Sequence, residues 1–158
     1  MKNEIRFIIT VCLLVAAAAL LPAQTAAELE AVLHEPVISC AQAARFVLAS
    51  AGGAASMGTA ASEGGEFAFE QAAAMGCFPK KAAPDDFINL GVLSFLCMKA
   101  FGIKGGLMYA IFPGPHYAFR TMVARSLIQG AADPAMTVNG ERFFHILGNV
   151  LSAAGGEE

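Results

Sequence analysis

The residues that could perform acid–base, nucleophilic or metal chemistry are few and far apart in this chain of 158 residues. Asp85 and Asp86 form an adjacent acidic pair, but they follow Pro84, where we expect them to solvate a turn and favour the start of the next helix. No two histidines have the i, i+4 spacing of a helical metal site. The histidines are His34, His116 and His145. The sequence therefore predicts neither a metal site nor a paired-carboxylate centre.

The cysteines outside the N-terminal apolar run also lack a chemical pattern. Cys40, Cys77 and Cys97 belong to no C-x-x-C motif and to no Cys/His cluster. Their odd number does not suit a disulfide framework, so we expect small apolar packing residues with at most one oxidised pair. No cofactor and no enzymatic activity are predicted. A small hydrolase with a site assembled from Cys40, His116 or Asp86 is the enzymatic alternative.

The connection "KAFGIKGGLMYAIFPGPHYAF", from Lys99 to Phe119, is the most apolar one in the chain. Its "GIKGG" lacks the preceding strand and the closing Gly-Lys-Ser/Thr of a phosphate loop, so we interpret it as a turn. The apolar residues either pack back onto the domain, which is the plainer expectation, or form a groove for a ligand or partner. Such a groove would use Tyr109, Phe112, His116, Tyr117 and Arg120.

The elements that position these residues follow a period of 50 residues. The stretches "VISCAQAARFVL", "FINLGVLSFLCM" and "TVNGERFFHILG" begin at Val37, Phe87 and Thr137. Each contains an apolar residue followed by a helix N-cap residue, Ser39, Asn89 or Asn139. The fourth helical positions, expected to be buried, are Ala43, Leu93 and Phe143. We predict an all-α fold of helix–loop–helix units in a pseudo-repeat, against the alternative of an alanine-rich bundle with coincidental matches.

Five helices are predicted from this pattern, each within a few residues. Their ranges are 39–51, 66–75, 89–101, 117–127 and 139–151. Glycines at or just past the helix ends are expected to adopt the left-handed C-cap conformation. These are Gly52, Gly76, Gly102 and Gly130. The small and polar stretch from Ala49 to Gly65 is expected to be a loop.

The N-terminus has the pattern of a secretory signal peptide. Lys2 and Arg6 precede an apolar run that ends at Leu21, before Pro22 and small residues. A retained membrane anchor is the competing interpretation, but the run is shorter than a spanning helix requires. We expect an exported protein of the periplasm or cell envelope. The predicted segments are a signal peptide over 1–23, a leader over 24–36, the helical domain over 37–151 and a flexible tail over 152–158.

The charge excludes one class of partner. The chain has 10 Lys and Arg residues against 13 Asp and Glu residues, for a formal net charge of −3. Without a basic stripe to follow a phosphate backbone, no nucleic-acid partner is expected.

The helical segments carry a resemblance to a known family. "VISCAQAARFVL" resembles the "ITRAEAA" signature of the S-layer homology (SLH) domain of exported bacterial proteins. "YAFRTMVARSLIQGAADPAMTVNGERFFHIL" resembles that family's aromatic-Ala helix, Gly-containing turn, Asp-bearing loop and second helix. "FAFEQAAAMGCFPKKAAPDDFINLGVLSFLCM" is a weaker copy, so that the resemblance extends from Val37 to Leu151.

The resemblance implies a non-catalytic module that tethers an exported protein to the cell envelope, commonly by binding a wall polysaccharide. The signature arginine of the family corresponds here to Cys40, Leu90 and Gly140, which cannot donate a charge-assisted hydrogen bond to an anionic sugar. The expected partner is an envelope component, either wall polysaccharide or an envelope protein. The alternative is a structural periplasmic protein that binds another protein or self-associates through its alanine-rich and aromatic faces.

Overall fold

The fold is all-α over the residues that the structure, a computed structural model, describes: 27–52, 64–130 and 133–155. The predicted helical class is confirmed, and no strand occurs in these ranges. The helices with described bounds are α2 (Cys40–Ala51), α4 (Gly65–Ala74), α5 (Leu90–Ala100), α6 (Leu107–Ile111), α7 (Pro115–Ala124) and α8 (Gly140–Gly155). No helix in these ranges is both long and apolar enough to span a bilayer.

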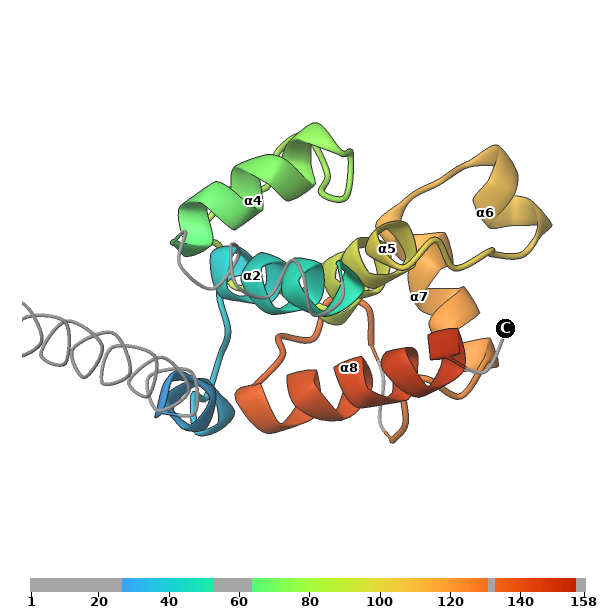
Figure 1. The fold of residues 1–158 in the computed structure, drawn as a ribbon. Helices are drawn as coiled ribbons and strands as arrows, with labels where there is room; N and C mark the ends of the chain where they lie inside the picture. The colour runs from blue at the N-terminus through green and yellow to red at the C-terminus, as the bar shows by residue number, and fades with distance from the viewer. Residues whose placement is uncertain (1–26, 53–63, 131–132, 156–158) are drawn as a thin grey trace, which may run out of the picture. The chain divides into compact units, whose positions relative to one another are not determined.

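The chain forms two units, Met1–Leu33 and His34–Glu158. In the first unit, residues 27–33 are helical, and the predicted signal peptide lies outside the described residues. The second unit contains all six helices named above (Figure 1). It begins within the predicted leader, because the Glu35 carbonyl accepts a hydrogen bond from the Gly140 N–H at 3.0 Å.

The predicted N-caps of α2, α5 and α8 are confirmed. Ser39 and Gln42 form the predicted capping box, in which the Ser39 Oγ accepts from the Gln42 N–H and the Gln42 Oε1 accepts from the Ser39 N–H. The side-chain oxygen of Asn89 accepts from the Val92 N–H at 2.9 Å. At the start of α8, the Asn139 Oδ1 accepts from the Arg142 N–H at 3.0 Å. Each cap supplies a partner for one free N–H group of the first turn.

A closed ring of backbone hydrogen bonds joins the three residues that precede these caps. The Ile38 N–H donates to the Val138 oxygen (3.0 Å), the Val138 N–H to the Ile88 oxygen (3.1 Å), and the Ile88 N–H to the Ile38 oxygen (2.9 Å). All three side chains are fully buried. The ring therefore holds the starts of α2, α5 and α8 together in the interior.

Neighbouring segments supply partners for the first amides of the same helices. The Cys40 N–H donates to the Asp86 carbonyl oxygen (2.8 Å), and the Leu90 N–H donates to the Met136 carbonyl oxygen (2.9 Å). Since the first four N–H groups of a helix have no partner within it, these bonds allow the helix starts to be buried.

α5 is the central helix of the second unit. Eight of its eleven residues are buried, and it packs against α2 and α7, while α2 also packs against α4 and α8. Figure 1 shows α4 above α2 and α8 below it. The predicted core positions Ala43, Leu93 and Phe143 are all buried. The Phe143 ring makes edge contacts with Phe46 and Phe144, at centroid distances of 6.2 and 5.1 Å.

Some predicted boundaries and caps are wrong. Gly76, Gly102 and Gly130 have the expected positive φ, but Gly52 has φ −79° because α2 ends in a right-handed turn. α8 continues to Gly155, through part of the predicted tail. The apolar connection, for which no helix is predicted, contains α6. Of the predicted loop from Ala49 to Gly65, residues 53–63 lie outside the described residues.

Phe143→Ala should lower the free energy of unfolding by about 3–5 kcal/mol, because it removes a fully buried ring from the contacts between α2 and α8. Urea unfolding followed by circular dichroism measures this loss. Phe87, whose side chain is 66% exposed, is the matched control, and Phe87→Ala should change stability by less than about 0.5 kcal/mol. Equal losses in the two variants would contradict the helix register.

Candidate binding site

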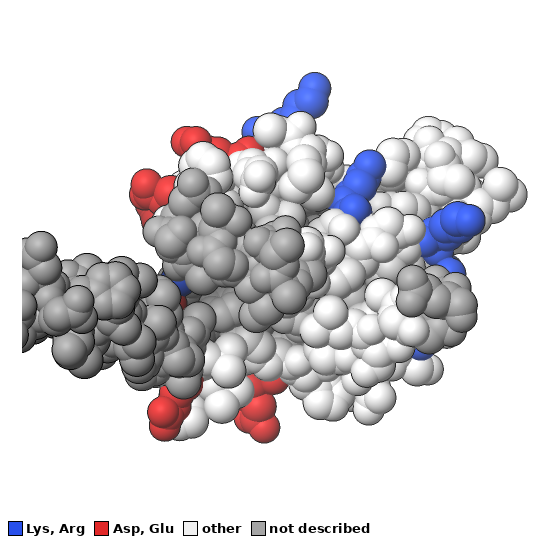
Figure 2. All heavy atoms as spheres, viewed as in Figure 1, with Lys and Arg blue, Asp and Glu red and all other residues white. Residues whose placement is uncertain are grey.

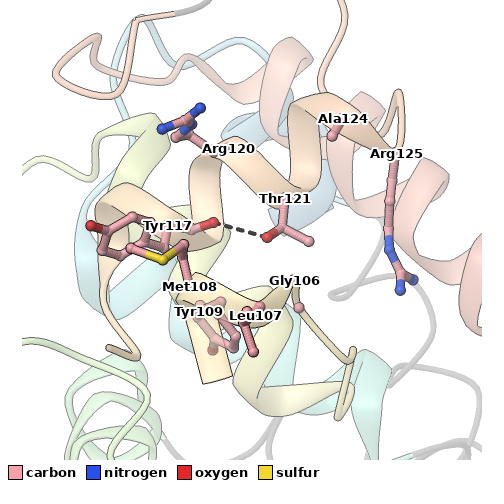
Figure 3. A pocket seen from close by; sticks show the side chains of 10 residues that line it. Gly106, Leu107, Met108, Tyr109, Tyr117, Arg120, Thr121, Ala124 and Arg125 are labelled. Atoms are coloured by element: carbon pink, nitrogen blue, oxygen red, sulfur yellow. Dashed lines mark hydrogen bonds between the residues drawn. The ribbon is translucent and has the colours of Figure 1, made fainter. Parts of the chain in front are cut away.

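An open hollow of about 560 Å³ lies between α6 and α7. Figure 3 shows the side chains that line it, which come from α7 on one side and from α6 with the turn before it on the other. The lining residues are Gly105, Gly106, Leu107, Met108, Tyr109, Tyr117, Arg120, Thr121, Ala124 and Arg125. The hollow thus combines aromatic rings, apolar side chains and two guanidinium groups.

α7 presents its contribution along one helical face. Pro115 stands at the first turn, where its fixed φ and missing N–H favour a helix start. The buried face, which holds Ala118, Phe119 and Met122, packs against α5. Spacings of three and four residues then direct a second row of side chains toward the hollow. That row consists of Tyr117, Arg120, Thr121, Ala124 and Arg125.

Hydrogen bonds determine what the polar groups of this row can do. The Thr121 hydroxyl donates to the Tyr117 carbonyl oxygen at 2.9 Å, the bond drawn in Figure 3. The Arg125 guanidinium donates to the Lys104 carbonyl oxygen at 2.8 Å and so links the connection before α6 to α7. Arg120 is exposed at the hollow. A guanidinium donates two parallel hydrogen bonds to a carboxylate or phosphate, so Arg120 suits an anionic ligand.

Tyr109 anchors α6 to the domain. Its ring lies against Gly105, where an added Cβ would clash with the ring, and it makes an edge contact with Phe95 at 6.5 Å. Its hydroxyl oxygen is buried without a hydrogen-bond partner in the described part of the chain. Burial raises the pKa of the Tyr109 hydroxyl, and the nearby Cys77 adds to the shift. Tyr109 is therefore a neutral packing residue whose ring also forms part of the wall.

Of the five residues predicted to bind a ligand or partner, three line the hollow. These are Tyr109, Tyr117 and Arg120. Phe112 ends α6 with its side chain 61% exposed, and it is not part of the wall. His116 lies exposed in the first turn of α7, with its ring 5.3 Å from that of Tyr117. Whether the hollow binds a ligand stays a prediction.

Sequence reasoning missed part of the wall. Thr121, Ala124 and Arg125 continue the row of Tyr117 and Arg120 by further steps of three and four residues. That helical spacing was the available signal. From the sequence, the glycines at 105 and 106 indicate only a turn, since the approach of the Tyr109 ring to Gly105 depends on the position of α6.

The residues considered for metal or nucleophilic chemistry do not form a common site in the described part of the chain. Among the described residues, no group of three or more His, Cys, Asp or Glu side chains could hold a metal ion. Cys40, Cys77 and Cys97 are buried free thiols. Burial raises the pKa of Cys40 to about 11, with a smaller contribution from Asp86, and burial raises that of Cys97 to about 12. Thiols held in the protonated form are poor nucleophiles and poor metal ligands.

The positions that the sequence resemblance matches to the SLH signature arginine are buried. Cys40, Leu90 and Gly140 are the first residues of α2, α5 and α8, and their amides bond to neighbouring chain segments. None of them faces solvent as a ligand contact would require.

Comparisons with protein families, with curated proteins and with solved structures return no match to this chain.

The thiol of Cys40 should be strongly protected in the folded protein. A pKa of about 11 instead of 9.0 lowers the thiolate fraction at pH 8 about 100-fold, and burial further slows access of a reagent. Iodoacetamide labelling at pH 8, followed by peptide mass spectrometry, should show slow reaction in buffer and fast reaction in denaturant. Fast labelling of Cys40 in the folded state would contradict its burial.

The raised pKa values of the buried thiols predict that the protein becomes less stable at alkaline pH. Because the folded-state pKa of the thiols is raised, their stabilising contribution is complete below about pH 9 and is lost as the pH rises toward about 11 or 12. The urea midpoint should therefore fall across this range, and less steeply in Cys97→Ala.

Proposed function

We propose that this chain is a non-catalytic binding module of the cell envelope, exported across the inner membrane and built on an SLH-like helical repeat of 50 residues. The observation that carries the proposal is the hollow between α6 and α7, which places Tyr117 beside Arg120 at an open surface. In this view the module holds a component of the envelope and performs no chemistry on it.

Support for the repeat comes from equivalent backbone positions. α2, α5 and α8 begin at residues 40, 90 and 140, and α4 and α7 cover 65–74 and 115–124. The turns after α4 and α7 also correspond, since Gly76 and Ser126 both have positive φ, 71° and 58°. The hydrogen-bond ring joins three residues that are each 50 apart. We interpret the chain as two complete units followed by a half-unit.

The chemistry of the hollow favours an anionic wall polysaccharide as the ligand. Sugar rings present C–H groups that pack on aromatic faces such as that of Tyr117, while the exposed Arg120 can bind a carboxylate or phosphate substituent. The signature positions at the helix starts are buried, so a tethering site in this chain has to lie elsewhere. We assign it to α6 and α7.

The test is cosedimentation of the protein with purified cell-wall sacculi. Wild type should sediment with the sacculi, and Tyr117→Ala/Arg120→Ala should weaken binding about tenfold or more, because it removes the aromatic face and a charged hydrogen-bond donor. Phe87→Ala/Lys80→Ala removes an aromatic ring that is more exposed than Tyr117, together with an exposed cation, away from the hollow, and should bind like wild type. Failure of wild type to sediment would overturn wall binding.

A second candidate function is self-association or binding of another envelope protein. It is favoured by the exposed apolar side chains of α6 and its C-terminus, which a partner surface could cover. Sedimentation equilibrium from micromolar to millimolar protein distinguishes the two. We expect a constant monomer mass; a concentration-dependent dimer that Phe112→Ser abolishes would favour the second candidate.

A further inference from the structure

α6 exposes apolar side chains that the fold leaves uncovered. None of its five residues is buried, and the side chains of Leu107, Ile111 and Phe112 are 76%, 56% and 61% exposed. Met108 adds a fourth at 49%. Isolated exposed apolar residues are common in proteins, but four within six consecutive positions form a patch that calls for a contact.

The patch is held away from the domain. Tyr109 points inward and fixes α6 through its contacts with Gly105 and Phe95, while glycine and proline residues on both sides end the helix after five residues. Figure 1 shows α6 projecting beyond α5 and α7. Ile111 and Phe112 therefore stand at the end of an anchored projection, and Leu107 and Met108, which also line the open hollow, are exposed beside them. All four side chains can enter a lipid interface without unfolding the domain.

The charged side chains in the segment that contains this projection have one sign. Between Asp86 and Asp133 the sequence contains no acidic residue, whereas it contains four cations: Lys99, Lys104, Arg120 and Arg125. Arg120 and Arg125 line the hollow beside α6, and Lys104 lies in the turn that leads into it. Lys99 lies on the α5 side, with its Nζ 5.8 Å from the Phe95 ring that Tyr109 contacts.

The space-filling view agrees with this distribution. Figure 2 shows the projecting α6 region in white, with blue Lys and Arg groups at its base and with the red Asp and Glu groups elsewhere on that face. A chain with a net charge of −3 therefore still has basic side chains at the base of α6 on this face.

We infer that α6 docks on an anionic lipid bilayer, with Leu107, Met108, Ile111 and Phe112 entering the interface and the four cations facing lipid phosphates. This rests on the proposed envelope function and names a component that the module contacts. Apolar insertion together with positive charge is the combination that holds peripheral helices on anionic membranes. Binding to a lipid surface does not require a specific pattern of polar groups on the protein. The exposed side chains of α6 and of Phe112, which follows it, provide no such pattern.

The absence of tryptophan allows a local test in the full chain. Phe112→Trp places a single fluorophore at the projection, and Phe87→Trp places one at a residue that is similarly exposed but lies outside the apolar projection. Vesicles of phosphatidylcholine with 30% phosphatidylglycerol should shift the emission of the Phe112→Trp variant to the blue, and lipids brominated in their acyl chains should quench it. The Phe87→Trp variant should show neither change. Because the readout is local, insertion of the N-terminal apolar run does not imitate it.

Charge variants test the second half of the inference. Lys104→Glu should weaken partitioning into the anionic vesicles by about tenfold or more, since each cation near such a surface contributes about fivefold and the substitution also adds a repelled charge. Lys80→Glu is the matched control with a small effect. Pure phosphatidylcholine vesicles and raised salt should both reduce binding.

The outcomes separate the two proposals. If anionic vesicles leave the emission of the Phe112→Trp variant unchanged, or shift that of the Phe87→Trp variant equally, lipid docking by α6 is overturned. If sacculi still retain the protein, the proposed wall-binding function stands without it. If neither sacculi nor vesicles bind and Phe112→Ser abolishes a dimer, the patch is a contact between copies and both proposals fall.

Discussion

The buried backbone at Ile38, Ile88 and Val138 is the constraint on which the second unit depends. Three chain segments enter the interior at these residues, where their amides and carbonyls have no access to water. An unpaired buried backbone group costs about 1–3 kcal/mol, so the segments satisfy one another in a closed ring of hydrogen bonds. The helices that follow must then start close together. Their first amides find partners in adjacent segments and in the caps Ser39, Asn89 and Asn139.

The position of the candidate site follows from that arrangement. With α2, α5 and α8 starting together, α5 becomes the central helix, and α7 packs on it through Phe119 and its apolar neighbours. The opposite side of α7 is left with Tyr117, Arg120 and the residues that continue their row. The connection between α5 and α7 must cross this side. Glycine and proline limit it to the short α6, which is fixed by Tyr109 and cannot cover the whole row.

The hollow and the apolar projection are thus two results of one short connection. A longer α6 could have packed an apolar stripe on α7 and closed the hollow. As it stands, the residues of α6 that face α7 form one wall, while Ile111 and Phe112 point to solvent. The proposed contacts with the cell-wall polysaccharide and with lipid therefore lie side by side on the same part of the fold. Net charge is a poor guide to such a surface, because the acidic residues of the chain lie outside the segment between Asp86 and Asp133.

The sequence by itself determined five of the six helices, the N-caps of α2, α5 and α8 and the core positions, because these depend on local spacing. Ser39, Asn89 and Asn139 cap helices where predicted, and Phe143 is buried as its place in the first turn of α8 implied. The sequence also pointed to Tyr117 and Arg120. Only the tertiary structure decided that the connection between α5 and α7 leaves Phe112 in solvent. The same apolar residues could equally have packed back onto the domain, so their composition does not distinguish the two arrangements. The approach of Tyr109 to Gly105, the ring of hydrogen bonds and the burial of Cys40, Leu90 and Gly140 all depend on how separate elements pack, whose geometry no local pattern specifies.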